Sequence, residues 1–220
     1  MKFKVITLFE DFINRLNEYS IIGRALRDRK IILKAINLRE FGLGRYHQVD
    51  DRPYGGGIGM LMRVDVLYRA LKVAAPRKNK KRLIVLLSAD GEKYNQKLAR
   101  EFKDKYDEIV LICGHYEGFD KRIEKYVDLK LSVGDYVLSG GEIAAMTIID
   151  SISRLVPGVL GKDESSEEET FSAIDGKEIL EYPQYTRPYD FKGEKAPDIL
   201  LSGDHAKIKK WKEKNIRFTS

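Results

Sequence analysis

Four short glycine-bearing segments hold most of the residues in this chain that could do chemistry. They are RPYGGGIGM at 52–60, LLSADG at 86–91, CGHYEG at 113–118 and VGDYVLSGGE at 133–142. Glycine lets a backbone approach a ligand closely, because no side chain intervenes. The segments contain few basic residues and lack the Gly-Lys-Ser or Gly-Lys-Thr of a phosphate-binding loop. Backbone groups together with Glu117, Asp135 and Tyr136 therefore favour a neutral or cationic ligand over a triphosphate.

The same segments admit simpler explanations. A set of ordinary tight turns would also account for the glycines. Cys113 near His115 could be a nucleophile, but we expect a buried structural cysteine, since free cysteine is among the most buried residue types. His115 shows no metal-ligand spacing with His47 or His205, and one cysteine cannot build a zinc site alone. We therefore predict no metal site made of these residues.

Alternating apolar and amphipathic segments must position these loops. Apolar runs predict strands at 3–8, 31–38, 83–87 and 109–112. Helical spacing predicts helices at 10–19, 63–75, 96–103 and 142–155. Strands that alternate with helices indicate an α/β fold with a parallel sheet. Ligands of such sheets bind at the carboxyl ends of the strands, where CGHYEG and VGDYVLSGGE are expected to lie.

Composition is that of a globular cytoplasmic protein. The 220 residues are 43% hydrophobic and 34% charged, which fits one large domain or one domain plus a smaller one. A net charge of +6 favours an anionic partner, although many solvated surfaces have a similar excess. The N-terminal segment lacks a signal-peptide pattern, and no apolar run approaches the ~18 residues that span a bilayer. We expect a cytoplasmic protein without membrane contact.

The composition changes after residue 160. The segment 163–170 holds five acidic residues in eight and is almost free of apolar side chains, as is typical of a linker. The following segment is rich in Tyr, Pro and Lys, and 192–220 contains eight Lys or Arg against four acidic residues. These features predict a small basic second unit that ends in an amphipathic helix.

Five motifs in order resemble those of a known enzyme family. They are DDRPYGGGIGM, CGHYEGFDKRI, VGDYVLSGGEIAAMTIIDSISRLVPGVLG, YPQYTRP and LLSGDHAKIKKW. Over nearly its whole length the chain is similar to the bacterial tRNA (guanine-N1)-methyltransferases, which belong to the SPOUT class of S-adenosylmethionine-dependent enzymes. The resemblance implies an α/β parallel sheet flanked by helices with a C-terminal trefoil knot in residues 1–160. It further implies a mobile acidic linker at 161–175, a small, mainly helical tRNA-binding domain at 176–220, and a homodimer with active sites at the subunit interface.

The resemblance also implies a site for S-adenosylmethionine in the knot loops. The matching residues are Leu87, Ser88, Gly114, Tyr116, Glu117, Ser132, Val133, Gly134, Tyr136, Leu138, Gly140 and Gly141. A cationic sulfonium, and an adenine that needs backbone hydrogen bonds and apolar walls, agree with loops that contain few basic residues. Mg²⁺ is a further expectation from the family.

The family methylates N1 of the guanosine immediately 3′ of the tRNA anticodon. That nitrogen carries a proton, so a base must remove it, and the negative charge that spreads to O6 needs a cation. By resemblance the cation is Arg154. The base is Glu169, in a Glu-Thr-Phe sequence where the family has Asp-Ser-Phe, and Glu167 and Glu168 are alternatives.

Contacts to the RNA follow from the same motifs. The resemblance assigns the flipped guanine and the anticodon stem-loop to Arg52, Tyr54, Gly59, Arg187, His205 and Lys207. The chain departs from the family at Ile58 and Ala89, where proline is usual, and at His115, where arginine is usual. Two competing hypotheses are an RNA-binding protein that has lost activity, suggested by Glu169, and a nucleotide-dependent transferase. The missing phosphate-binding loop argues against the transferase.

Overall fold

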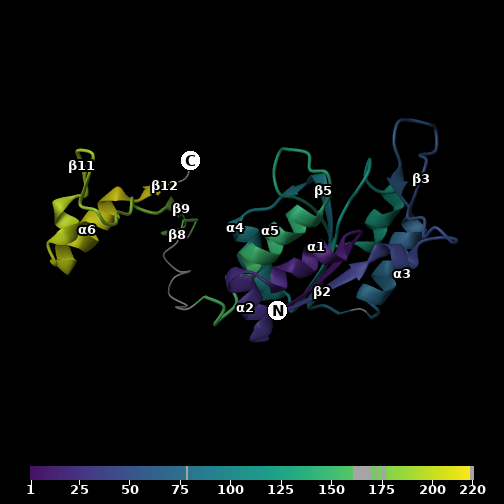
Figure 1. The fold of residues 1–220 in the computed structure, drawn as a ribbon, viewed down its shortest axis with the longest axis horizontal. Helices are drawn as coiled ribbons and strands as arrows, with labels where there is room; N and C mark the ends of the chain where they lie inside the picture. The colour runs from purple at the N-terminus through teal and green to yellow at the C-terminus, as the bar shows by residue number, and fades with distance from the viewer. Residues whose placement is uncertain (78, 161–169, 172, 175–176, 219–220) are drawn as a thin grey trace. The chain divides into compact units, whose positions relative to one another are not determined.

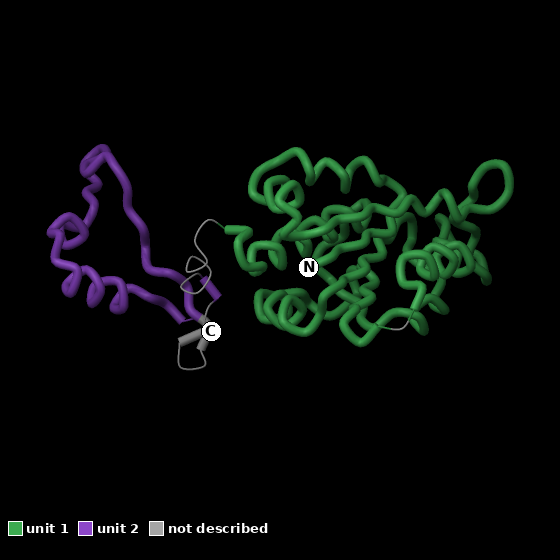
Figure 2. Tube along the Cα trace, turned by 90° about the horizontal axis from the view of Figure 1, so that it is seen from below, with its two compact units in different colours: residues 1–162 green, residues 163–220 purple. Residues whose placement is uncertain are grey.

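The computed structural model describes residues 1–77, 79–160, 170–171, 173–174 and 177–218. The chain divides into two compact units, residues 1–162 and residues 163–220, which are coloured separately in Figure 2. No helix in the described parts of the chain combines the length and the apolar character that a bilayer crossing requires.

A five-stranded sheet forms the centre of the first unit (Figure 1). Its strands are β1 (Lys2–Thr7), β2 (Ile32–Asn37), β5 (Arg82–Lys93), β6 (Glu108–Ile112) and β7 (Leu129–Ser132). They lie in the order β2-β1-β6-β5-β7, and every pairing is parallel. All five residues of β6 are buried, as expected for a parallel strand covered on both faces. The predicted α/β fold with a parallel sheet is confirmed.

Helices cover both faces of this sheet. On one face lie α1 (Glu10–Asn14), α2 (Ser20–Arg27), α4 (Gln96–Lys105) and α5 (Glu142–Ser153). On the other lie α3 (Val64–Ala74) and the 3₁₀ helices η2 (Leu38–Phe41) and η3 (Lys121–Tyr126). Side chains alternate across a strand, so Phe3 and Val5 of β1 join the first apolar cluster whereas Ile6 joins the second.

The first helical region differs from its prediction. A single helix at 10–19 is wrong, because α1 ends at Asn14 and a 3₁₀ turn, η1 (Arg15–Asn17), follows. Ser20 has a left-handed backbone (φ 56°), which separates this turn from α2, a helix that the sequence analysis did not predict. A Cβ on Gly23 would lie 2.7 Å from the carbonyl oxygen of Asn17, so glycine permits α2 to pack on η1.

The strand β5 is longer than predicted. Residues 88–91 were expected in a loop after the strand, but they belong to β5. Leu87 and Glu92 both pair with Leu131 of β7, so the register shifts and the intervening residues bulge from the ladder. Gly91 allows this, because a Cβ there would lie 2.5 Å from the backbone nitrogen of Leu131.

Two shorter elements frame the glycine-rich segment at 52–60. They are β3 (Asp50–Asp51) and β4 (Leu61–Met62), which pair in antiparallel fashion. The segment is therefore the connection of a small hairpin, and Gly55, Gly56 and Gly59 adopt the positive φ values that favour glycine.

In its described residues the second unit contains one α-helix, α6 (His205–Asn215), and a 3₁₀ turn, η5 (Asp198–Leu201). Its described strands are β8 (Ala173–Ile174), β9 (Lys177–Leu180), β10 (Asp190–Phe191), β11 (Glu194–Lys195) and β12 (Arg217–Phe218). The side chain of Asp204 accepts a hydrogen bond from the Lys207 N–H at 3.1 Å and caps α6. Trp211 of this helix packs edge-on against Tyr182 and Tyr185.

Candidate active site

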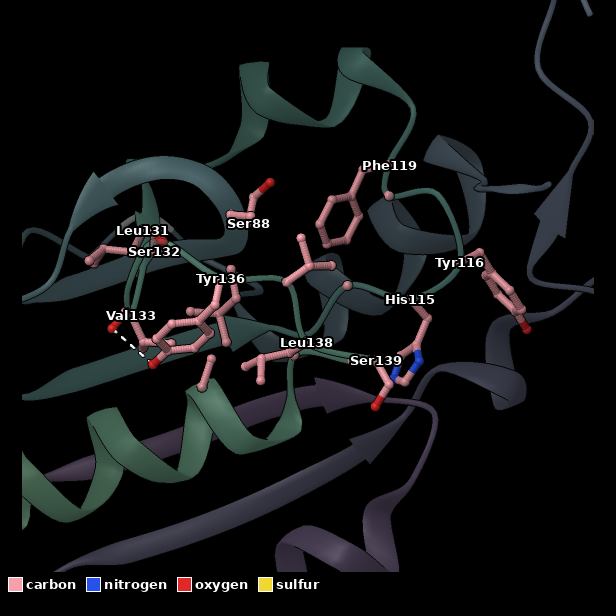
Figure 3. A pocket seen from close by; sticks show the side chains of 18 of the residues that line it. Ser88, His115, Tyr116, Phe119, Leu131, Ser132, Val133, Tyr136, Leu138 and Ser139 are labelled. Atoms are coloured by element: carbon pink, nitrogen blue, oxygen red, sulfur yellow. Dashed lines mark hydrogen bonds between the residues drawn. The ribbon is translucent and has the colours of Figure 1, made fainter. Parts of the chain in front are cut away.

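A pocket of about 200 Å³ opens at the carboxyl ends of β6 and β7 and beside residues 87–89, where β5 begins to bulge (Figure 3). All twelve residues that the sequence analysis assigned to a cofactor line it: Leu87, Ser88, Gly114, Tyr116, Glu117, Ser132, Val133, Gly134, Tyr136, Leu138, Gly140 and Gly141. These residues come from three separate segments of the chain. The structure therefore brings the whole predicted set to one place, as the strand-end rule for parallel sheets predicts.

Eight further lining residues were not assigned to a cofactor. They are Ala89, His115, Gly118, Phe119, Leu131, Val137, Ser139 and Ala144. Most are sequence neighbours of assigned residues, so their position in the same loops could have predicted that they line the pocket. Phe119 closes one side of the pocket, as Figure 3 shows.

Two of the loops that form the pocket touch through their backbones. The N–H of Gly141 donates to the carbonyl oxygen of Gly114 at 2.9 Å. A Cβ on Gly141 would lie 2.7 Å from the Cα of Cys113, closer than real Cβ atoms approach other atoms. The Gly-Gly pair of VGDYVLSGGE is therefore needed for the close packing of two pocket loops.

The pocket is lined by apolar side chains, glycine backbone and hydroxyl groups, together with His115 and Glu117. Tyr136 donates its hydroxyl hydrogen to the carbonyl oxygen of Val133 at 3.2 Å, the dashed line in Figure 3. Ser132 donates to the carbonyl oxygen of Gly134 at 2.9 Å, which fixes the start of the same loop. No Lys or Arg is found among the described residues that line the pocket. This composition suits a ligand with an apolar ring and a positive centre.

The β5 edge of the pocket is held by a polar network that the sequence analysis missed. Ser88 donates to Asp90 at 2.6 Å, and Lys130 lies 2.7 Å from the other carboxylate oxygen of Asp90. These hydrogen bonds, that of Lys130 first, lower the pKa of Asp90 to about 2. Lys130 lies forty residues from Asp90 in the sequence, so only the β5–β7 pairing brings the two together. Asp135, on the loop after β7, forms an exposed ion pair with Lys93.

A buried carboxylate lies behind the Gly140–Gly141 turn. Glu142 is only 5% exposed, and His115 Nε2 lies 2.9 and 2.8 Å from its two oxygens. Thr7 donates its hydroxyl hydrogen to Glu142 Oε1 at 2.5 Å. Burial raises the pKa of Glu142, but the hydrogen bonds from His115 and Thr7 outweigh this effect and lower it. Glu142 is therefore an ionised, fully bonded group at neutral pH.

Cys113 lies beneath this pair and is 1% exposed. Burial, with a smaller contribution from the negative charge of Glu142, raises the pKa of its thiol well above the usual value. A thiol of this kind is a poor nucleophile. The prediction of a buried structural cysteine is confirmed.

The glycine-rich loop at 52–60 reaches the pocket through Gly59. The N–H of Glu117 donates to the carbonyl oxygen of Met60 at 3.0 Å, and a Cβ on Gly59 would lie 2.4 Å from Glu117 Cγ. Arg52 and Tyr54 are exposed on the same loop, Tyr54 to 98%. The structure therefore places the segment assigned to guanine beside the segment assigned to the cofactor.

Arg154 is not brought to this pocket within one chain. It follows the last residue of α5, whereas the pocket lies against the beginning of that helix. The twelve residues of α5 rise about 1.5 Å each, so Arg154 lies about 18 Å along the axis from Glu142. Arg154 is exposed and takes part in interactions of its own.

The remaining assigned residues lie in other parts of the chain. Arg187, His205 and Lys207 are exposed residues of the second unit, and Lys207 pairs with Asp204 at 3.0 Å. Glu169, with the alternatives Glu167 and Glu168, lies outside the described residues. No group of three His, Cys, Asp or Glu side chains in the described ranges is arranged to hold a metal ion.

Comparison with known proteins identifies the family. A profile of the family "tRNA (Guanine-1)-methyltransferase TrmD" matches residues 1–219. A tRNA (guanine-N(1)-)-methyltransferase of Carboxydothermus hydrogenoformans is 50% identical over 97% of this chain and 82% of its own length. Relatives with the same name from Clostridium perfringens (strain SM101) and Mycoplasma capricolum are 47% and 44% identical, each over 97% of this chain and over 87% and 85% of their own lengths. The chain belongs to the tRNA (guanine-1)-methyltransferase family.

Proposed function

We propose that this protein transfers a methyl group from S-adenosylmethionine to N1 of the guanosine immediately 3′ of the anticodon in tRNA. Membership of the family supports the reaction class, tRNA (guanine-N1) methylation. The observation that carries the proposal is the gathering of twelve matched residues from three segments around one pocket. The position of the target nucleotide follows from the resemblance in sequence.

The pocket fits the cofactor in its chemistry. Backbone groups of the 133–141 loop suit adenine, and apolar side chains such as Leu87 and Leu138 supply walls for a ring. Glu117 supplies a carboxylate for a positively charged ligand, and no lining side chain in the described chain is a Lys or Arg that would repel one. When bound, S-adenosylmethionine provides an electrophilic methyl group.

The chain supplies the base and the counter-charge for the guanine. Glu169 accepts the N1 proton of the guanosine, which makes that nitrogen nucleophilic. Arg154 stabilises the negative charge that develops on O6. Tyr54 and Arg52 are exposed on the hairpin loop whose Gly59 and Met60 lie beside Glu117, and they contact the flipped base in the proposed complex.

A homodimer with active sites at the subunit interface agrees with two features of the first unit. First, Arg154 lies a helix length from the pocket of its own chain, and a second copy would supply the arginine to that pocket. Second, the large side chains of Phe9, Phe12 and Ile143 are exposed around a second cavity of about 250 Å³. Exposed apolar surface of this kind is typical of protein interfaces.

The proposal assigns a role to each part of the chain. Residues 1–160 form the knotted cofactor-binding domain, and 161–175 form the linker that brings Glu169 to the partner's pocket. Residues 176–220 form the small, mainly helical domain whose Arg187, His205 and Lys207 bind the anticodon stem-loop. The basic residues of α6 favour a phosphate-rich partner.

A methyl-transfer assay tests the function. The full-length protein would be incubated with radiolabelled S-adenosylmethionine and tRNA transcripts that carry guanosine or adenosine at the target position. We expect incorporation only with guanosine and with magnesium present; undiminished incorporation with a chelator would contradict the family expectation for Mg²⁺. Tight tRNA binding without incorporation would instead support an RNA-binding protein that has lost its activity.

A further inference from the structure

The pocket wall at residues 88–91 lies outside the regular pairing of the sheet. The pairing of β5 with β6 ends at Leu86. Leu87 and Glu92 both pair with Leu131 of β7, so residues 88–91 have no partner residue in either register. Contacts other than the strand ladder must therefore hold this part of the wall in place.

Asp90 supplies such a contact. Its carboxylate accepts a hydrogen bond from the Ser88 hydroxyl at 2.6 Å and a second one, on its other oxygen, from Lys130 Nζ at 2.7 Å. Ser88 lines the pocket, as Figure 3 shows, whereas Lys130 belongs to β7. The side chain of Asp90 therefore ties the unpaired wall to the neighbouring strand.

Lys130 is held from a third element as well. Its Nζ lies 3.2 Å from Glu124 Oε1 of η3, and Glu124 also pairs with Lys121 at 2.6 Å. The side chain of Lys130 is 23% exposed, against 71% for Asp90. The lysine is thus the fixed member of the pair, and Asp90 is the mobile member that it restrains.

We propose that Asp90 and Lys130 are positioning residues of the cofactor site, which hold Ser88 and the 88–91 wall in the arrangement that binds the ligand. The inference rests on the proposed function, because it takes the pocket to be the S-adenosylmethionine site. Both residues lie outside the pocket lining, and neither is assigned a contact with the reacting atoms.

Loss of the pair is expected to weaken ligand binding and to leave the fold nearly unchanged. An exposed ion pair contributes little to the free energy of unfolding. Without the pair, however, the wall is free to move, and a ligand that needs it in place must order its side chains on binding. Because ordering even one or two side chains is unfavourable, we expect affinity to fall about threefold to tenfold.

The test is calorimetric titration of the full-length protein with S-adenosylhomocysteine. Asp90→Ala removes both hydrogen bonds, and Lys130→Met removes the cation but keeps a long unbranched side chain. Each variant is expected to bind about threefold to tenfold more weakly than the wild type and to keep its melting temperature. The double variant is expected to bind no more weakly than Asp90→Ala alone, because the two residues act through one contact.

Methyl-transfer kinetics separate positioning of the wall from a general loss of structure. The KM for S-adenosylmethionine is expected to rise in Asp90→Ala, while kcat at saturating cofactor stays at the wild-type value. The reason is that the wall contributes equally to binding of the ground state and of the transition state. A disturbed active site would lower kcat instead.

Glu101→Ala and Lys105→Met are the matched controls. This exposed pair has a similar separation, 2.8 Å, but lies within α4 and outside the pocket lining, so affinity is expected to stay unchanged. Asp90→Ala binding within about twofold of the wild type, additive losses in the double variant, or a lowered kcat would overturn the inference and leave the cofactor site standing. No binding of S-adenosylhomocysteine by the wild type would overturn the proposed cofactor site and the inference with it.

Discussion

An alanine at position 141 is expected to weaken cofactor binding more than it weakens the fold. Its Cβ would lie 2.7 Å from Cys113 Cα and 2.8 Å from the Gly114 nitrogen, whereas ordinary contacts begin at 3.4 Å. The neighbouring atoms are backbone, so no side chain can turn away. The two loops must part by the difference between 3.4 and 2.7 Å, about 0.7 Å.

That displacement has a cost that can be worked out. The hydrogen bond from Gly141 to Gly114 would stretch from 2.9 Å to about 3.6 Å and be lost, at about 0.5–1.5 kcal/mol. A ligand that needs the two loops in their original position must also compress the added Cβ against the backbone, and such overpacking costs about 1–3 kcal/mol. The total of about 1.5–4.5 kcal/mol corresponds to a roughly tenfold to thousandfold loss of affinity, since about 1.4 kcal/mol is a factor of ten.

Calorimetric titration with S-adenosylhomocysteine measures this loss. Gly23→Ala is the matched control, because its Cβ would also lie 2.7 Å from a backbone atom, the Asn17 oxygen, but in α2 and outside the pocket lining. Gly23→Ala is expected to lower the melting temperature and to leave the affinity unchanged. If Gly141→Ala bound the ligand within about twofold of the wild type, the packing argument would be refuted.

Two further predictions concern carboxylates. Glu169→Gln is expected to lower kcat by about 10²–10⁴ and to leave S-adenosylhomocysteine binding unchanged, since in the proposed reaction it removes only the base. An active Glu169→Gln together with an inactive Glu168→Gln would instead assign the base to Glu168. Burial raises the pKa of Glu108, but hydrogen bonds from Arg82 and Lys4 outweigh this effect, so the pKa is lowered. The ionised Glu108 therefore stabilises the fold at pH values above the usual glutamate pKa, and this contribution is lost as the pH falls through the pKa of the folded state. Glu108→Gln is expected to cost about 1–3 kcal/mol at neutral pH, with the difference in melting temperature from the wild type shrinking toward acid pH; a constant difference would contradict this.

The sheet was predictable because its strands are buried on both faces. The continuous apolar runs around Val85 and Val110 can pair only inside a sheet covered by helices, and their order with helices between them fixes parallel pairing. The loops that follow these strands then meet at one edge, which is why the residues of CGHYEG and VGDYVLSGGE share a pocket.

Other features depend on contacts that are distant in sequence. The extension of β5 to Lys93 requires the register shift against β7, and no local pattern marks it. The hydrogen bond between His115 and Glu142 joins residues 27 positions apart and becomes visible only when the two loops pack. The helix α2 is short and contains Gly23, which lowers the local helix propensity. The sequence pattern therefore did not predict this helix.

The position of Arg154 leads to a test of the shared active site. If each site combines the pocket of one subunit with Arg154 and Glu169 of the other, an Arg154→Ala subunit and a Gly141→Ala subunit should complement each other. The mixed dimer then contains one intact site, formed by the unaltered pocket of the first subunit and the unaltered arginine of the second. Random pairing makes about half of all dimers mixed, so about a quarter of the wild-type sites should be restored.

The control mixes Arg154→Ala with Glu169→Gln. Both changes then lie on the side that reaches into the partner's pocket, so each site of the mixed dimer lacks either the arginine or the base, and no activity should return. Methyl transfer to tRNA after co-refolding measures both mixtures, and calorimetry confirms that Arg154→Ala alone binds S-adenosylhomocysteine normally. Restoration in neither mixture would mean that pocket and arginine act within one chain, which the helix-length separation in α5 argues against.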